Sequence, residues 1–362
     1  MKWSILLLIA ASIGTGCSYT KSENKINSEQ SNESSMKNEI KVADYATDSA
    51  IEVQTKSFLK SLNTSGGKPM ETMQPADARK VLEGAQTSVK IDISGVEVSE
   101  KTITEDGITV KLFIMRPAGV EETLPAFMFF HGGGWVLGDF PTHQRFIRDL
   151  VVNSGAVAVH AEYTRSPEAK YPTAINECYA AAKWVSENGS EINVDGKSLA
   201  IVGNSVGGNL TAAVALMAKN KKGPEFKLQV LFWPVTNASF ETVSYNKYAN
   251  DRFLTKNMMK WFWDNYAPDQ NQRNEIYASP LRASLDELKG LPPTLVQTAE
   301  NDVLRDEGEA YARKLNEAGV AVSLVRYQGM IHDYGLLNPL ATIPEVQSAL
   351  LYAAVELKKA LK

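Results

Sequence analysis

The chain has 362 residues, of which 44% are hydrophobic and 22% are charged. This composition is typical of a folded globular protein and excludes a fibrous or wholly disordered chain. The 38 Lys and Arg residues against 42 Asp and Glu residues give a formal net charge of -4, and no basic run is interleaved with aromatic residues. Binding of nucleic acid is therefore not expected. The length suffices for one large hydrophobic core with an appended subdomain.

Residues 1–17 have the pattern of an export signal. Lys2 supplies a positive charge, nine mostly apolar residues (5–13) follow, and small residues precede Cys17. The apolar run is too short to span a bilayer, which needs about 20 residues. The segment resembles a bacterial lipoprotein signal, in which the Cys becomes the lipidated first residue after cleavage, although Gly14 occupies a position that is usually aliphatic. The alternative is an ordinary secretory signal in which Cys17 has no role.

The lipoprotein resemblance implies an exported protein at the cell envelope that touches the membrane only through its lipid, whereas the alternative implies a periplasmic or secreted soluble protein. Residues 18–42 are rich in Ser, Asn, Glu and Lys and nearly lack aliphatic side chains. They cannot bury enough surface to fold alone and are predicted to form a flexible polar tether. With Cys17 lipidated, Cys178 is the only remaining thiol, so no intrachain disulfide is expected and Cys178 is interpreted as a buried small side chain.

Two helical stretches come next, at 51–62 and 76–82, and they predict amino-terminal cap helices within residues 43–90. From residue 91 to 362 the pattern is that of a catalytic domain in which short apolar strands alternate with amphipathic helices. Strands at 96–104 and 108–115 flank a Glu-Asp-Gly turn and predict a β-hairpin.

Six further strands and five helices follow the hairpin. The strands are predicted at 126–130, 157–161, 199–202, 230–233, 294–297 and 322–327, and the helices at 143–153, 173–188, 205–219, 307–318 and 344–361. The alternation predicts an α/β fold with a mostly parallel eight-stranded sheet covered by helices on both faces. The interval at about 237–290 is too long for one crossover and is rich in aromatic residues, so it is predicted to be a cap insertion.

A sharp turn between a strand and a helix carries the clearest chemical signal. Gly203-Asn204-Ser205-Val206-Gly207 has the pattern G-x-S-x-G and lies between the strand at 199–202 and the following helix. Such a turn projects the serine oxygen above the sheet, and its glycines avoid collisions with the neighbouring strand and helix. We therefore expect Ser205 to be a nucleophile.

A glycine loop follows the strand at 126–130. In His131-Gly132-Gly133-Gly134-Trp135 the backbone N–H groups can converge without obstruction by side chains. The N–H groups of Gly133, Gly134 and Val206 are expected to form an oxyanion hole. A flexible loop and a phosphate cradle are the alternatives, but the cradle would be followed by Lys and Ser or Thr rather than by Trp135-Val136-Leu137.

A serine nucleophile needs a base, and the chain offers four histidines. His332 follows the last strand, where loops converge on the carboxyl edge of the sheet, so it is the expected general base. Asp302 follows the strand at 294–297 and is the expected orienting acid, since the order Ser, Asp, His is the one this fold uses. The remaining histidines are interpreted as structural, and the rival acids are Glu300, Asp306 and Asp333. No cluster has the spacing of metal ligands, so neither a metal nor another cofactor is expected.

These motifs resemble those of the hormone-sensitive-lipase-like family of bacterial esterases and acetyl esterases. The resemblance extends over about 101–361 and is carried by residues 131–139, by the elbow at Ser205 and by 299–309. It implies oxyanion glycines, a serine nucleophile and a triad acid at the matching positions. It also implies helical caps from the amino terminus and from mid-chain.

The chain departs from the family pattern at a few positions. The family's common elbow is Gly-Asp-Ser-Ala-Gly. In this chain Asn204 and Val206 replace its Asp and Ala, so a carboxylate next to the nucleophile is missing. The base lies in His332-Asp333-Tyr334 where His-Gly-Phe is common, and residues 163–168 read Tyr-Thr-Arg-Ser-Pro-Glu where Tyr-Arg-Leu-Ala-Pro-Glu is usual. These departures leave the triad intact and concern substrate preference.

The expected function is hydrolysis of short-chain acyl esters, such as acetyl esters, through an acyl-enzyme intermediate. The expected partner is a small-molecule ester. An amidase or acyltransferase could use the same triad, and a non-catalytic ligand-binding protein on the same scaffold is the alternative from another class. The aromatic residues Trp261, Phe262, Trp263 and Tyr266 are candidates either for a pocket wall or for packing within the cap.

The interpretation of Cys17 makes a testable prediction. Expressed in a bacterial host with a clickable fatty-acid probe, the wild-type chain should be labelled and a Cys17→Ala variant should not. Equal labelling of the two chains, or no labelling of either, would rule out the lipid anchor. Cys178→Ala is the matched control and should label like the wild type.

Overall fold

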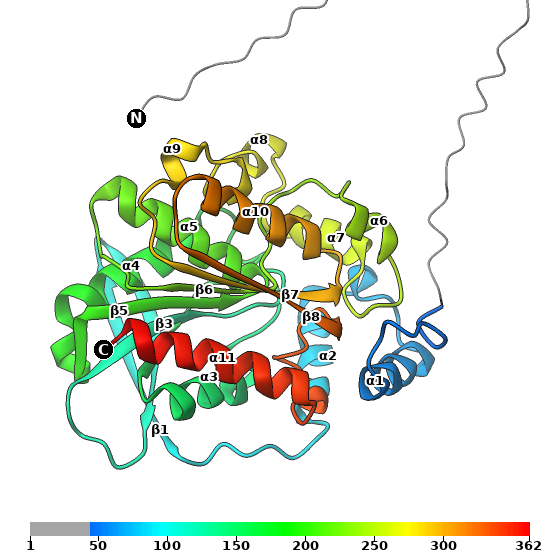
Figure 1. The fold of residues 1–362 in the computed structure, drawn as a ribbon, viewed down its shortest axis with the longest axis horizontal. Coiled ribbons are helices and arrows are strands. Elements are labelled where there is room, and N and C mark those ends of the chain that lie inside the picture. The colour runs from blue at the N-terminus through cyan, green and yellow to red at the C-terminus, as the bar shows by residue number, and fades with distance from the viewer. Residues whose placement is uncertain (1–43) are drawn as a thin grey trace, which may run out of the picture. The chain divides into compact units, whose positions relative to one another are not determined.

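The computed structural model describes residues 44–362 (Figure 1). The predicted signal segment at 1–17, the tether at 18–42 and Cys17 lie outside the described residues, so those interpretations stay predictions. Within the described residues, no helix is long and apolar enough to cross a membrane.

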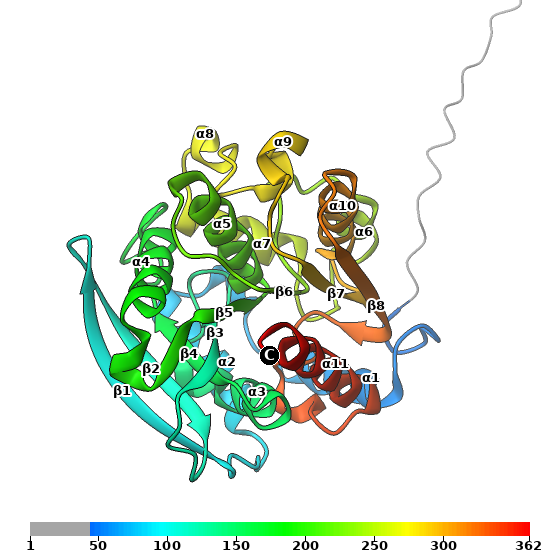
Figure 2. The same cartoon turned by 60° about the vertical axis from the view of Figure 1, so that its left-hand side comes forward.

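The core is an eight-stranded sheet with the strand order β1-β2-β4-β3-β5-β6-β7-β8. The hairpin β1–β2 is antiparallel, β2 pairs antiparallel with β4, and every later neighbour is parallel. The predicted mostly parallel α/β fold is thereby confirmed. Figure 2 shows the hairpin at one edge of the twisted sheet and β7–β8 at the other. The strands are β1 Val96–Glu105, β2 Ile108–Pro117, β3 Leu124–Phe130, β4 Val157–Glu162, β5 Val194–Asn204, β6 Gln229–Phe232, β7 Thr294–Asn301 and β8 Val322–Ile331.

Helices cover both faces of the sheet, as the alternating pattern predicts. Side chains of β3 alternate between two buried clusters, with Met128 and Phe130 in one and Phe127 and Phe129 in the other. The first cluster includes residues of α4 Thr173–Asn188, α5 Val206–Lys221 and α10 Arg305–Glu317, and the second includes residues of α3 Phe140–Ser154 and α11 Pro344–Ala360. In Figure 1 these two groups of helices lie on opposite sides of the sheet. Cys178 is buried in the first cluster, as its interpretation required.

The strand before Ser205 is longer than its pattern predicts, because β5 begins at Val194 rather than at residue 199. The pairing of β3 with β5 shifts register between Pro125 and Ala126, so the segment around Gly196 forms an irregularity within the strand. A bulge of this kind contains turn-type residues, which is why the sequence pattern places the start of the strand too late.

Two amino-terminal helices, α1 Val53–Thr64 and α2 Pro75–Thr87, lie where the helical patterns were found. Between residues 237 and 290 the chain forms only short helices and one longer one, α7 Lys256–Tyr266. The short ones are α6 Val243–Lys247, α8 Gln270–Arg273, η3 Pro280–Arg282 and α9 Leu285–Leu288.

Helix α2 is hydrogen-bonded to the segments that follow β3, β4 and β8. The Arg79 guanidinium donates to the Val136 carbonyl at 2.8 Å and forms a bidentate ion pair with the Glu168 carboxylate. The Gln86 side chain is buried and donates to the carbonyl oxygens of Thr142 and Leu336 at 2.6 and 3.0 Å. Helix α2 is therefore fastened to the carboxyl edge of the sheet, where the predicted site residues lie.

Candidate active site

Ser205 occupies the turn between β5 and α5. Its backbone φ of 55° and ψ of −119° are unusual for a residue with a side chain and hold it in a strained turn. A Cβ at Gly203 would collide with the backbone of Gly207, and a Cβ at Gly207 would collide with the carbonyl of Phe130. Both glycines are needed because the elbow packs directly against its own helix and against the end of β3.

The structure brings Ser205, His332 and Asp302 together from three separate loops. The Ser205 hydroxyl lies 2.9 Å from Nε2 of His332, and Nδ1 of His332 lies 2.7 Å from Oδ2 of Asp302. These are hydrogen-bond distances, with Nδ1–H donating to the carboxylate and Nε2 free to accept the serine proton. The three residues are 4%, 2% and 1% exposed, so the arrangement is shielded from solvent.

The rival acids have other partners. Glu300 accepts the Gly329 N–H at 2.9 Å, and Asp306 accepts the Ser244 N–H at 2.7 Å. Asp333 lies on the far side of the imidazole, with its Oδ2 at 3.8 Å from Nε2 of His332. Of these carboxylates, Asp302 is therefore the one that can orient the ring through Nδ1.

The electrostatic surroundings of His332 favour a protonated ring. Burial opposes the charged form, but the Asp302 and Asp333 carboxylates outweigh it, so the pKa of His332 lies above its usual value of 6.5. An imidazolium formed at Nε2 is therefore stabilised by two carboxylates. The neutral ring that acts as a base is correspondingly favoured at higher pH.

The glycine loop after β3 presents unpaired N–H groups. Gly133 and Gly134 have φ values of 104° and 64°, which favour glycine. Within residues 44–362, no protein group accepts the backbone N–H of Gly133 or Gly134. Val206 is the first residue of α5, and the first N–H groups of a helix have no partner within it. Among the described residues, the three N–H groups predicted to form the oxyanion hole therefore have no acceptor in the protein.

Gly132 differs from its two neighbours because its N–H is occupied. It donates to Oδ1 of Asn204 at 3.0 Å and to Nε2 of His143 at 3.2 Å. Asn204 in turn donates from Nδ2 to Oδ1 of Asp333 at 3.1 Å. By sequence, Asn204 replaces a carboxylate next to the nucleophile. In the structure, the Asp333 carboxylate contacts the Asn204 side chain.

The three other histidines are buried in and next to the glycine loop, and none of them is hydrogen-bonded to Ser205. The rings of His131 and His160 stack at 5.5 Å, and those of His131 and His143 lie 5.4 Å apart. Burial lowers the pKa of His143 to about 4, so its ring is neutral and can accept the Gly132 N–H at neutral pH. The structural role expected for these residues fits this placement.

The four aromatic residues of the predicted cap insertion divide into two groups. Trp263 and Tyr266 are buried and pack on Trp135, with ring centroids 4.7 and 4.1 Å away. The Phe262 ring lies against the glycine loop, since a Cβ at Gly134 would collide with it. Packing within the cap therefore accounts for Trp263 and Tyr266, while Phe262 borders the candidate site and Trp261 lies beside it at 5.2 Å.

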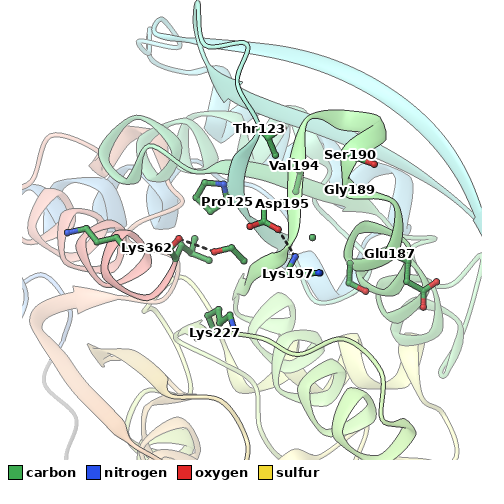
Figure 3. Close-up of a pocket in the computed structure, with 14 residues that line it drawn as sticks. Thr123, Pro125, Glu187, Gly189, Ser190, Val194, Asp195, Lys197, Lys227 and Lys362 are labelled. Atoms are coloured by element: carbon green, nitrogen blue, oxygen red, sulfur yellow. Dashed lines mark hydrogen bonds between the residues drawn. The ribbon is translucent and has the colours of Figure 1, made fainter.

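A separate surface hollow lies at the other end of the strands (Figure 3). Its lining includes Pro125 near the start of β3, Val194 at the start of β5 and the carboxyl-terminal Lys362. Ser205 follows the opposite end of β5, so this hollow is not part of the candidate active site. Among the residues that the structure describes, no group of three or more His, Cys, Asp or Glu side chains could hold a metal ion.

The sheet, the elbow at Ser205 and its contact with His332 define an α/β hydrolase. A family model for the α/β-hydrolase fold matches residues 127–336. The chain therefore belongs to this family, which confirms the resemblance found in the sequence.

Three relatives illustrate the similarity. The crystal structure of a thermostable esterase from Pseudomonas putida ECU1011 is 64% identical and covers 87% of this chain and 99% of its own, with a TM-score of 0.86. The carboxylesterase NlhH of Mycobacterium tuberculosis is 34% identical over 74% of this chain and 83% of its own. The ethyl acetate hydrolase of Pseudomonas putida is 32% identical over 75% of this chain and 86% of its own.

The buried position of His143 makes a prediction about stability. Because burial lowers its pKa to about 4 in the folded state and an unfolded histidine titrates near 6.5, the unfolded chain binds more protons between these values. The contribution of His143 to the free energy of unfolding should thus fall by about 2 kcal/mol between pH 7 and pH 5.

Urea unfolding of the wild type and of His143→Gln at both pH values measures this contribution, since other titrating groups cancel in the difference. The stability difference between the two chains should shift in favour of the variant at pH 5. A difference that does not change with pH would show that His143 is not held neutral.

Proposed function

We propose that this chain hydrolyses carboxylic esters with short acyl groups, acetyl among them, through a covalent intermediate on Ser205. The single observation that carries the proposal is the buried hydrogen-bonded series Ser205–His332–Asp302 at the elbow. Membership of the family and the esterases named above support ester hydrolysis as the class of reaction.

In the first half-reaction, Ser205 transfers its hydroxyl proton to Nε2 of His332 while Oγ attacks the ester carbonyl carbon. The carbonyl oxygen becomes an oxyanion, which accepts hydrogen bonds from the N–H groups of Gly133, Gly134 and Val206. The imidazolium then gives its proton to the alkoxy oxygen as the carbon–oxygen bond breaks. The alcohol leaves and the acyl group remains on Ser205.

In the second half-reaction, water replaces the alcohol. His332 removes a proton from the water as its oxygen attacks the acyl carbon, and the same three N–H groups hold the second oxyanion. When this intermediate collapses, the proton returns to Oγ of Ser205 and the carboxylic acid is released. Asp302 accepts the Nδ1–H of His332 throughout and keeps Nε2 directed at Ser205. All of these steps use only side chains, backbone groups and water.

The limit on acyl length is assigned to Phe262. Its ring lies against Gly134, one of the proposed oxyanion donors, so a substrate carbonyl held there has an aromatic wall beside it. Each buried methylene contributes about 0.8 kcal/mol, so kcat/KM should rise with acyl length only until the chain reaches this wall. A relative that carries the name ethyl acetate hydrolase supports a short acyl group.

The cellular address is a proposal that rests on the first 17 residues alone. Their signal-like pattern and Cys17 support an exported protein held at the envelope by a lipid. This address would place the esterase where it meets small esters from outside the cytoplasm.

Removing the nucleophile tests the mechanism. Ser205→Ala should fold normally and lose hydrolysis of p-nitrophenyl acetate by about 10⁶-fold, because the residues of a triad act as a unit. The unfolding midpoint of the variant serves as the folding control, and a p-nitroanilide measured beside the ester tests amidase activity. Turnover in Ser205→Ala close to that of the wild type would falsify the assignment.

The pH profile tests the base. Because the neutral form of His332 accepts the proton and its pKa lies above 6.5, kcat/KM should fall as the pH drops through an apparent pKa above 6.5. A profile that stays flat down to pH 4 would contradict this role of His332. Stopped assays over short times separate the titration from slow acid unfolding.

The position of Phe262 predicts a change in acyl preference. In a p-nitrophenyl ester series from acetate to palmitate, the wild type should be most efficient within about two to six carbons, and Phe262→Ala should shift the optimum to longer chains. Trp263→Phe is the matched control on the same helix, since Trp263 packs on Trp135 within the cap, and its optimum should not move. A wild-type optimum at laurate or beyond would refute the short-chain proposal, and an unmoved optimum in Phe262→Ala would exclude Phe262 as the wall.

A further inference from the structure

A single buried amide connects the elbow, the glycine loop and the loop of the proposed base. Asn204 precedes the nucleophile, and its Oδ1 accepts the N–H of Gly132 in the glycine loop at 3.0 Å. Its Nδ2 donates at 3.1 Å to Asp333, which follows the base. Asn204 is fully buried and Asp333 is 6% exposed, so water does not compete freely for these bonds.

The partners of Asn204 allow only one orientation of its amide. The Gly132 N–H can only donate, and an ionised carboxylate can only accept. A flipped amide would set two donors against each other at Gly132 and two acceptors against each other at Asp333. The Asp333 carboxylate therefore selects the orientation in which Oδ1 of Asn204 faces Gly132.

Asp333 is itself held in place. Its Oδ1 also accepts the indole N–H of Trp233 at 2.7 Å, so one carboxylate oxygen receives two buried donors. The other oxygen, Oδ2, lies 3.8 Å from Nε2 of His332. The carboxylate thus has one oxygen committed to positioning Asn204 and the other near the proposed base.

We propose that Asn204 and Asp333 are a coupled pair of positioning residues that holds the oxyanion loop in register with the nucleophile and the base. The inference deepens the proposed ester hydrolysis and rests on it. Gly132 lies immediately before Gly133 and Gly134, so the bond to its N–H anchors the start of the segment that carries the two proposed donors. The bond from Asn204 shares this task with His143, which accepts the same N–H.

The pair also explains two departures of the sequence from its family pattern. An amide at position 204 needs an acceptor for Nδ2, and Asp333 supplies it where a glycine is common. The carboxylate missing beside the nucleophile is thus present, on the loop of the base instead of on the elbow. We therefore expect the two positions to depend on each other.

Four variants test this dependence through kcat, KM and the pH profile with p-nitrophenyl acetate. Asp333→Ala removes the acceptor, so kcat should fall about 10-fold to 100-fold with little change in KM, in line with a displaced oxyanion donor. Asp333→Asn can keep an oxygen facing Trp233 and Asn204, so it should recover most of that loss in kcat. Its pH profile should nevertheless move to lower pH, because the charge near His332 is gone.

The decisive comparison is the effect of Asp333→Ala on kcat in two backgrounds, because the proposal predicts opposite effects in the wild type and in Asn204→Asp. Asn204→Asp sets two acceptor oxygens about 3.1 Å apart where a donor now faces an acceptor, so kcat should fall. Adding Asp333→Ala to this variant removes one carboxylate and should raise kcat at high pH, whereas the same substitution lowers kcat in the wild type. A folding defect cannot mimic this gain, since a second damaging substitution would lower activity further.

The possible outcomes distinguish a failure of the proposed coupling from a failure of the proposed function. If the fold-losses of Asn204→Asp and Asp333→Ala simply multiply in the double variant, or if Asp333→Ala changes only the pH profile, the proposed coupling is overturned. If the wild-type chain lacks Ser205-dependent activity on p-nitrophenyl acetate, the proposed function fails. In that case the pair loses its stated role as well.

Discussion

The close approach of α5 to the end of β3 is the constraint on which the rest of the site depends. Gly207 lies so near the Phe130 carbonyl that a side chain there would collide with it, and the turn at Ser205 just before it has a φ of 55°. The strain is sustained because β5 is paired on both sides and α5 is buried. This close packing places the first N–H of α5 and the glycine loop, which follows β3, next to Ser205.

Charge is distributed unevenly around the candidate active site. His332 has a carboxylate beside each ring nitrogen, with Asp302 at 2.7 Å from Nδ1 and Asp333 at 3.8 Å from Nε2. The histidines in and next to the glycine loop stay neutral instead, because burial lowers the pKa values of His131 and His143. The site thus stabilises a proton on the proposed base while the histidines that support the loop remain neutral. This contrast lets one imidazole exchange protons and lets its neighbours serve as fixed hydrogen-bond partners.

Local sequence patterns predicted the fold and the placement of the triad residues because each depends on short-range features. The strand–Gly-x-Ser-x-Gly–helix order, the glycine loop and the position of His332 after the last strand all lie within short windows. The contact between Asn204 and Asp333 joins residues 129 positions apart, and no local pattern reveals it. The same holds for Phe262 against Gly134 and for Arg79 with Glu168, since the packing of the caps decides both. The sequence did mark positions 204 and 333 as unusual, but only the structure shows that the two departures are bonded to each other.

The central claim is that Ser205 carries the acyl group between the two half-reactions. Rapid acid quenching during turnover of p-nitrophenyl acetate, followed by mass spectrometry of the peptides, measures this directly. The account predicts an acetyl group on the peptide that contains Ser205, its absence in Ser205→Ala, and a much slower appearance in His332→Ala. An acetyl group found on a different residue during productive turnover, or one that forms on Ser205 at an unchanged rate without His332, would contradict it.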